Sequence, residues 1–539
     1  MKLLAYVRKY IFYYKTCFLK FILYSFIFWI ITIVTPYISG DYIDILVYGQ
    51  AKNTIYLYSL IILVISILHI IISYLKDVTY TRLLNDVTFK LNMEIFNLLN
   101  RVPLNYFQSK DAVYLSQRIS DDTNLLVDFC ISNPILILSN SLSVLISLFI
   151  LFKINIITFF VLFWSIPIYI IVYIKFKDKL YETNYLYREK ANKYQAQIVE
   201  QFTNVKFIKT NVLFNETNSR LEDGYQEFIG FVIKFFKFSY FFSNTNLIVL
   251  KVINAFVICY GGLQVIEGHI SVGKFSIIST YFSMIMLSVD YFTSLSSNYQ
   301  QALVSYDRLM EFENEPKEVN GLIKLNDIFK ISMNCVRFSY HGENKILFNL
   351  TEVFEKGKVY CLQGANGAGK SSFVNLLIGL YPEYEGDIAF NQINIREIDC
   401  YDLRHNIIGV VGQEPCLIKG SILDNLVYGL NGIVFEKVVY WCKKFDIYDM
   451  IDNLPDKFNT LMSENVGNIS GGEKQKISII RILLKDAPIL IFDEPTSALD
   501  FSSINIFKQI ICDIKKNKII FIISHDKQVL EIANKIINI

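Results

Sequence analysis

A glycine-rich loop between an apolar segment and a helical pattern is the chemically most specific feature of the sequence. It reads Gly364-Ala-Asn-Gly-Ala-Gly-Lys370-Ser371, which has the GxxxxGK[ST] spacing of a phosphate-binding loop. Residues 359–363 predict the preceding strand, and residues 372–380 predict the following helix. In such a loop the backbone N–H groups surround a β-phosphate, the lysine reaches the β- and γ-phosphate oxygens, and the serine hydroxyl binds magnesium. The sequence therefore predicts that ATP and Mg²⁺ are bound by Gly364, Asn366, Gly367, Gly369, Lys370, Ser371 and Ser372.

Two further apolar segments end in polar residues that suit phosphate chemistry. Residues 489–492 are followed by Asp493, a candidate magnesium ligand, and by Glu494, a candidate base for the attacking water. Adjacent buried carboxylates without such a role would be costly. Residues 519–523 are followed by His525, which we interpret as a bridge between the γ-phosphate and that water. A histidine at a strand end, taken alone, is more often structural.

The part of the chain that carries these residues alternates short apolar segments with helical patterns. This alternation begins near residue 313 and is typical of an α/β domain. We expect a linker over residues 314–326 and a nucleotide-binding domain over residues 327–539.

Residues 1–313 have the composition of a membrane domain. Hydrophobic residues make up 53% of the chain, and a helix needs about 20 apolar residues to cross a bilayer. Six runs approach or exceed this length: 21–38, 55–75, 131–152, 154–174, 238–266 and 275–295. Basic residues at the N-terminus and after the fourth run place both termini in the cytoplasm. We predict a multi-pass protein of the cell membrane, surrounded by lipid.

The segments between the second and third runs and between the fourth and fifth runs are long. They contain about 55 and about 70 residues and are charged but periodically apolar. We expect them to form helical arms that extend about 40 to 50 Å into the cytoplasm. Solvated loops are the alternative, but long loops without secondary structure are uncommon.

Charge and cysteine content exclude other classes of protein. The net charge of +2 gives no reason to expect a nucleic-acid partner. The nine cysteines form no CxxC pair, so a zinc site or a disulfide framework is not expected.

The second half resembles the ATP-binding cassette proteins. Ile469-Ser470-Gly471-Gly472-Glu473 is similar to the family signature, and Gln413 in Val411-Gly412-Gln413-Glu414-Pro415 is similar to its Q-loop. Ser497-Ala498-Leu499-Asp500 resembles the D-loop, and Tyr340 resembles the aromatic residue that stacks on adenine. The resemblance implies that Tyr340, Ser470, Gly471, Gly472 and Asp500 contact ATP. It also implies that Gln413 serves both magnesium binding and catalysis, beside Glu494 and His525.

The first half resembles the exporter branch of the same family. Pro103-Leu104 with Phe107 is similar to the first cytoplasmic coupling loop, and Ile208-Lys209 with Glu216 is similar to the second. The implied fold is an all-α membrane domain of six helices followed by an α/β P-loop NTPase domain. The chain departs from the family at Glu473, where the signature usually has glutamine, and at residues 463–466, which replace the usual cross-talk sequence. No peptidase-like sequence precedes the first run, so we do not expect this chain to cleave leader peptides.

The resemblance implies a dimer. In this family the signature of one subunit covers the ATP bound by the phosphate loop of another, so one chain cannot complete a site alone. A homodimer is the simplest arrangement because every motif is intact, and a heterodimer with a related chain is the alternative.

Polar residues within the apolar runs suggest a transport pathway. Small polar residues of the third and sixth runs recur at helical spacing, although such faces also let membrane helices pack closely. His69, Lys251, Asn254 and Asp290 are the candidate pathway residues. Charges at such depth are expensive, and we hypothesise an interaction between Lys251 and Asp290. A buried structural pair and the absence of contact are the alternatives.

The combined features favour ATP-driven export of an amphipathic or peptidic compound, such as a peptide antibiotic. Flipping of a lipid or lipid-linked sugar and multidrug efflux are alternatives of the same class. An ATP-gated channel or a regulatory partner belongs to a different class, which the intact Glu494 and His525 disfavour.

Overall fold

The computed structural model describes residues 2–49, 52–108, 112–339, 348–365, 367–430, 432–462 and 469–539. The chain divides into two compact units. The first contains Met1–Leu99 and Ala112–Asn314, and the second contains Asn100–Asp111 and Glu315–Ile539.

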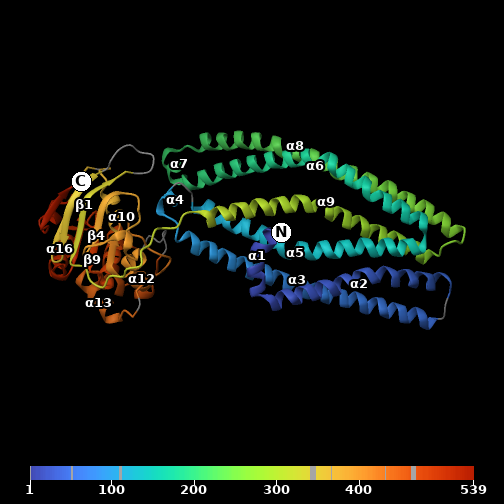
Figure 1. Cartoon of the computed structure of the whole chain (residues 1–539), viewed down its shortest axis with the longest axis horizontal. Helices are drawn as coiled ribbons and strands as arrows, with labels where there is room; N and C mark the ends of the chain where they lie inside the picture. Colours follow the sequence, from blue (N-terminus) through green and yellow to red (C-terminus); the bar gives the residue numbers. More distant parts are fainter. Residues whose placement is uncertain are drawn as a thin grey trace. The chain divides into compact units, whose positions relative to one another are not determined.

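The first unit is helical (Figure 1). Its helices are α1 (Lys2–Tyr13), α2 (Lys15–Val47), α3 (Lys52–Leu99), α5 (Ala112–Ile154), α6 (Ile156–Thr203), α7 (Val205–Asn211), α8 (Phe214–Ile266) and α9 (Val272–Asn314). Five of the six apolar runs each lie within a separate long helix, and the fourth lies in α6 except for its first two residues. By length and composition alone, the described residues give four candidate spans, in α2, α3, α5 and α9, and a shorter apolar segment in α8. The chain is therefore a multi-pass membrane protein.

The boundary between the third and fourth runs differs from the sequence prediction. The fourth run was expected to begin at Ile154, but α5 ends at that residue and α6 begins at Ile156. Asn155 separates the two helices because its side-chain carbonyl accepts hydrogen bonds from the backbone N–H groups of Ile157 and Thr158, both at 3.0 Å. A polar capping residue inside an apolar stretch thus decides where the chain reverses.

The long helices pack as pairs: α2 with α3, α5 with α9, and α6 with α8 (Figure 1). The helical arms expected from the sequence are present, since α3, α6 and α8 continue far beyond their apolar runs. A buried cluster that includes Leu151, Leu162, Val257 and Ile278 joins α5, α6, α8 and α9.

The second unit is an α/β domain built on two main sheets. The five-stranded sheet has the order β11 (Lys535–Asn538), β3 (Val359–Gln363), β10 (Ile519–Ile523), β9 (Ile489–Asp493) and β6 (Ile408–Val411), and all its pairings are parallel. The four-stranded antiparallel sheet has the order β2 (Phe348–Glu355), β1 (Lys330–Phe338), β4 (Glu385–Phe390) and β5 (Ile393–Asn394). A short pair is formed by β7 (Gly420–Ser421) and β8 (Leu461–Met462).

From Glu315 onward, the described residues of the second unit also contain eight α-helices. They are α10 (Lys370–Leu377), α11 (Cys400–Asp402), α12 (Ile422–Val427), α13 (Phe435–Lys444), α14 (Tyr448–Asp452), α15 (Gly471–Lys485), α16 (Phe501–Ile514) and α17 (Lys527–Leu530). The strands β9 and β10 are almost wholly buried, as expected for near-continuous apolar strands in a parallel sheet. The helix after the phosphate loop begins at Lys370 and ends at Leu377, earlier at both ends than the predicted 372–380.

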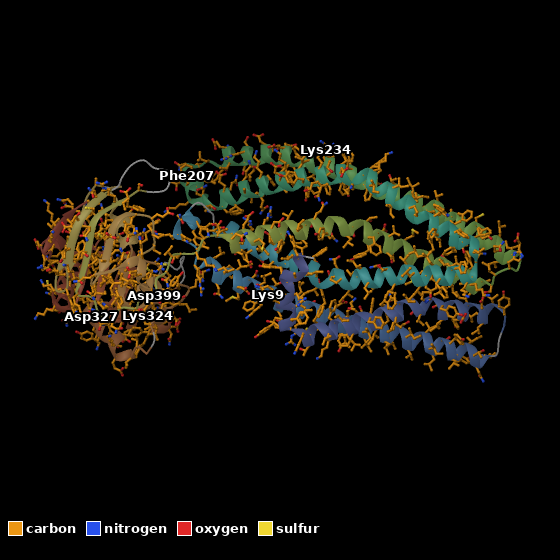
Figure 2. All side chains as sticks on the ribbon, in the orientation of Figure 1. Lys9, Phe207, Lys234, Lys324, Asp327 and Asp399 are labelled. Carbon is orange, nitrogen blue, oxygen red and sulfur yellow. The ribbon has the colours of Figure 1, made fainter. Side chains whose placement is uncertain are left out.

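All but the first residue of the expected linker, residues 314–326, belongs to the second unit. Asn314 is the last residue of α9, and Ile323 forms a parallel bridge with Ile398. The Asn320 side chain donates to the Asp399 carboxylate at 3.0 Å and accepts from the Cys400 backbone N–H at 2.7 Å. Figure 2 labels Asp399 together with Lys324 and Asp327 on this unit.

The short helix α4 (Leu104–Gln108) also belongs to the second unit, although it lies between α3 and α5 in the sequence. Leu104 packs against the core that includes Phe338 and Tyr381, and the Glu318 backbone N–H donates to the Arg101 carbonyl at 2.7 Å. The first predicted coupling loop is therefore part of the same compact unit as the nucleotide-binding residues.

Candidate nucleotide site

The parallel sheet brings the predicted phosphate-binding residues together. Strands β3, β10 and β9 are neighbours, and in parallel strands the carboxyl ends lie at one edge of the sheet. The phosphate loop follows β3, His525 follows β10, and Asp493 and Glu494 end and follow β9. Gln413 follows β6, the neighbour of β9, and is exposed at the same edge. The topology thus brings four segments that are distant in the sequence to one edge of the sheet.

The phosphate loop has the backbone geometry that its glycines permit. Gly367 and Gly369 have φ values of 81° and 102°, which side-chain-bearing residues rarely adopt. Gly369 precedes α10, so the N-terminus of that helix, with its unpaired N–H groups, faces the loop. The Lys370 ammonium donates to the Gly364 carbonyl at 2.7 Å and lies 2.9 Å from His525 Nε2.

Ser371 and Asp493 fit a magnesium ion. The serine hydroxyl lies 3.4 Å from Asp493 Oδ2. Two oxygens bound to one Mg²⁺ at about 2.1 Å would be about 3.0 Å apart when adjacent and about 4.2 Å apart when opposite. Burial and the neighbouring Glu494 raise the pKa of Asp493. A bound cation would act in the opposite direction and favour the charged carboxylate.

Glu494 and His525 lie side by side next to the phosphate loop. His525 Nε2 is 3.9 Å from Glu494 Oε1, and the glutamate side chain is 22% exposed. The Glu494 backbone has a φ of 48° and donates its N–H to the Ile523 carbonyl at 2.9 Å. This left-handed conformation turns the chain sharply after β9, and strained backbone of this kind is often found at active sites.

The signature and D-loop residues begin two helices. Ser470 caps α15 in a reciprocal box with Glu473, whose carboxylate accepts from the Ser470 N–H at 2.6 Å. The glutamate at this position therefore performs a capping function, which explains how the chain accommodates its departure from the usual glutamine. Asp500 caps α16, and hydrogen bonds from Ser503 and Ser502 lower its pKa to about 2.

The structure describes some of the remaining residues that were predicted to bind ATP, but not all of them. Tyr340 and Asn366 lie outside the described residues, as do residues 463–468. Gly471 is exposed, and a Cβ on Gly472 would lie 2.7 Å from the Ala498 carbonyl, so only glycine fits there. In the described part of the chain, no hydrogen bond joins Ser470 to the phosphate loop.

Arg481 connects the signature helix to the segment after Gln413, a role that the sequence did not reveal. Its guanidinium donates to the Cys416 carbonyl at 2.9 Å and to the Asn425 carbonyl at 2.5 Å. Asn425 is fully buried and in turn exchanges hydrogen bonds with Ile418. The arginine therefore fixes α15 relative to the Q-loop segment.

We predict that Arg481→Ala lowers the stability of the nucleotide-binding domain by about 1–3 kcal/mol, because the carbonyls of Cys416 and of the buried Asn425 lose their guanidinium donor. The midpoint of thermal unfolding and the ATPase rate should both fall. Arg481→Lys keeps one donor and should lose less. Equal unfolding midpoints for wild type and Arg481→Ala would show that these hydrogen bonds contribute no stability.

The candidate pathway residues are not gathered into one cluster. His69 stacks on Phe28 with ring centroids 4.4 Å apart and lies 3.3 Å from the Thr32 hydroxyl. Lys251 and Asp290 are exposed in the single chain, and Asn254 is partly buried. Among the described residues no ion pair joins Lys251 to Asp290, so the hypothesised interaction does not form within one chain.

Together these features define a P-loop nucleotide-binding domain fused to a helical membrane domain. Comparisons with known proteins agree. Residues 18–289, half of the chain, match the model of the ABC transporter transmembrane region, and residues 347–497 match the model of the ABC transporter ATP-binding domain. The chain belongs to the ABC transporter family, as a half-transporter with both domains on one chain, and it is an ATP-hydrolysing transporter.

Individual relatives cover nearly the whole chain at low identity. A lactococcin-G-processing and transport ATP-binding protein of Lactococcus lactis is 26% identical over 92% of this chain and 71% of its own length. An alpha-hemolysin translocation ATP-binding protein of Escherichia coli is 25% identical over 97% of this chain and 74% of its own. ABC transporter B family member 1 of Dictyostelium discoideum is 24% identical over 94% of this chain, which spans 56% of that protein.

The fold is also that of a solved structure. A bacterial Atm1-family ABC exporter with ATP bound superposes with a TM-score of 0.82, covering 97% of this chain and 93% of the other. The two sequences are 19% identical, so this likeness concerns the fold. It confirms the predicted order of a helical membrane domain and an ABC domain.

Proposed function

We propose that the chain uses ATP hydrolysis to export an amphipathic or peptidic compound across the cell membrane by alternating access. The observation that carries this proposal is the single edge of the parallel sheet where Lys370, Ser371, Asp493, Glu494 and His525 meet. A domain that only senses ATP does not need a base and a histidine beside the phosphate loop.

The site residues divide the work of hydrolysis. Lys370 and the N–H groups at the start of α10 bind and orient the phosphates. Ser371 and Asp493, with Gln413 nearby, are the residues that would hold Mg²⁺, which neutralises charge on the phosphates when bound. Glu494 accepts a proton from the attacking water, and His525 orients the γ-phosphate and that water.

The functional unit we propose is a homodimer in which the signature of each chain completes the site of the other. Ser470 has its polar contacts within its own capping box, so its position is compatible with use by a second chain. The tip of the long arm also supports a partner contact. Phe207 and Val205 of α7 and its C-terminal capping residue Val212 are 61%, 45% and 67% exposed, an apolar surface that a second nucleotide-binding domain would cover.

A complementation experiment tests the dimer. Lys370→Ala removes the phosphate-binding lysine, and Ser470→Arg blocks the signature, so each homodimer has two defective sites. A mixed dimer of the two variants keeps one complete site, and we expect it to regain up to half of the wild-type ATPase rate. The rate is measured on differently tagged chains purified together in lipid. No recovery in the mixed dimer would contradict a site shared between chains.

The proposed substrate class is supported by the relatives of the chain, and the proposed membrane orientation is supported by its basic residues. Relatives are described as transporting lactococcin G and translocating alpha-hemolysin, which favours a peptidic substrate for this chain. We place both termini in the cytoplasm because of the basic residues there. Flipping of a lipid and efflux of drugs remain the alternative transport activities.

A further inference from the structure

A cavity of about 590 Å³ lies within the membrane domain between α2, α3, α5 and α9. Its volume is typical of sites that bind small molecules or a few side chains. Its lining includes Ser25, Trp29, Lys76, Asp77, Tyr80 and Asp128. Ser139 and Ser143 are small polar residues of the third apolar run, whereas Asp128 lies just before that run.

The charges of this cavity do not balance. The Lys76 ammonium lies 3.3 Å from the Asp77 carboxylate and 4.2 Å from the centre of the Phe28 ring, so its charge is already compensated. Asp128 accepts a hydrogen bond from the Tyr80 hydroxyl, and no cation of the described residues forms an ion pair with it. One carboxylate in the cavity is therefore without a counter-charge.

A second polar group in the cavity has no partner. Ser25 is 9% exposed, and its hydroxyl oxygen is buried and makes no hydrogen bond to any described residue. A buried hydroxyl without a partner costs free energy, and a ligand that bonds to it recovers that cost. The other polar groups differ: the Trp29 indole, for example, already donates to the Ser143 hydroxyl at 2.8 Å.

Aromatic and apolar side chains complete the surface around these two groups. Phe21 packs against Tyr80 with ring centroids 5.4 Å apart, and Phe28, Met284 and Leu287 line the remaining wall. Aromatic rings attract a cation through their faces and bury an apolar body. The site thus combines a carboxylate without a counter-charge, a buried hydroxyl without a hydrogen-bond partner, and apolar walls.

We infer that this cavity binds a primary amine carried on an apolar body. The ammonium would donate hydrogen bonds to Asp128 and Ser25, which a quaternary ammonium group cannot do. This inference rests on the proposed export function, because it specifies the substrate as an amphipathic molecule with a basic group. An amine of this kind is supplied by a lysine-containing apolar peptide or by the headgroup of phosphatidylethanolamine.

The test measures binding to the full-length protein in phosphatidylcholine nanodiscs without nucleotide. The probe is a tetrapeptide with blocked ends, three apolar residues and one lysine, and the reference probe is the same peptide with that lysine acetylated. Wild type should bind the lysine peptide about tenfold or more tightly than the reference, as expected for charge-assisted hydrogen bonds. Asp128→Asn should abolish this preference.

Matched variants separate binding from folding. Asp121→Asn removes an exposed carboxylate of the same helix and should keep the preference, and so should Asp128→Glu. Ser25→Ala should reduce the preference about threefold or more, which tests the site independently if Asp128→Asn does not fold. The inference is overturned if wild type binds both peptides equally, or if Asp128→Asn or Ser25→Ala retains the full preference.

A second arm identifies the source of the amine and separates this inference from the proposed function. If phosphatidylethanolamine in the nanodisc competes with the peptide in wild type but not in Asp128→Asn, the lipid headgroup is the occupant. If phosphatidylethanolamine does not compete with the peptide, the occupant is the lysine-containing peptide. Because no ATP is present, the preference is expected in Glu494→Gln as well. If the protein does not hydrolyse ATP but still prefers the lysine peptide to the acetylated one, the result would contradict ATP-driven export and would still support the amine site.

Discussion

Replacing Glu494 by glutamine is expected to reduce the ATPase rate by about 10²–10⁴-fold, the usual contribution of a positioned general base. Glutamine has nearly the same shape but cannot accept the proton of the attacking water. Glu494 lies 3.9 Å from His525, which in turn is 2.9 Å from Lys370, so the substitution acts where the phosphates are bound. Phosphate release in lipid-reconstituted protein measures the effect.

Binding of ATP should be unaffected by this substitution, because Lys370 and the phosphate loop are unchanged. Glu531→Gln is a suitable control, since Glu531 is an exposed glutamate of the same domain that pairs with Lys508 at 2.7 Å. That control should hydrolyse ATP at the wild-type rate. Substantial hydrolysis by Glu494→Gln would assign the base to a different residue.

Replacing Asp122 by alanine is expected to lower the stability of the membrane domain by about 3 kcal/mol, the lower end of the cost of breaking a buried ion pair. Asp122 is 3% exposed, and its carboxylate lies 3.8 Å from both Arg118 and Arg308. It also accepts a hydrogen bond from the Ser305 hydroxyl at 2.8 Å. Without Asp122, Arg308 of α9 loses the carboxylate of α5 with which it pairs, and Ser305 loses its acceptor.

Arg118 retains its ion pair with Glu311 in this variant, so the loss is confined to the contacts of Asp122. The midpoint of thermal unfolding should fall by roughly 6–12 °C, by the usual relation between stability and midpoint for a domain of this size. Asp121→Ala removes an exposed carboxylate one position earlier and should leave the midpoint unchanged. Equal midpoints for both variants would contradict a buried network between these helices.

The sequence predicted the parts of the molecule that depend on local patterns. The six apolar runs each form part of a separate long helix, and β3 and β10 have the predicted bounds. The phosphate loop could be assigned because its function requires a fixed spacing of glycine, lysine and serine. The predicted start of the fourth run was wrong because hydropathy does not register a single capping residue such as Asn155.

Features that depend on contacts between distant segments were harder to predict from the sequence. The cavity residue Asp128 lies outside any apolar run, and its partner Tyr80 is 48 positions away. Lys251 and Asp290 were paired from similar depth alone, but depth does not fix which way each side chain faces. The link from Arg481 to Cys416 likewise appears only after the chain has folded. Tyr340 and Asn366 stay predictions from the sequence.

ATP-dependent accumulation of a peptide in proteoliposomes is the most direct test of the central claim, which is that ATP hydrolysis drives export. Wild type and Glu494→Gln are compared in vesicles to which Mg²⁺ and ATP are added from outside. Under these conditions only protein molecules whose nucleotide-binding domains face outward can use the ATP. The lysine-containing amphipathic peptide should accumulate inside the vesicles with wild type and ATP, but not with Glu494→Gln. Hydrolysis of ATP by wild type without movement of this peptide, a lipid probe or a drug probe would contradict the proposed export. Binding of ATP by wild type without hydrolysis would contradict it as well.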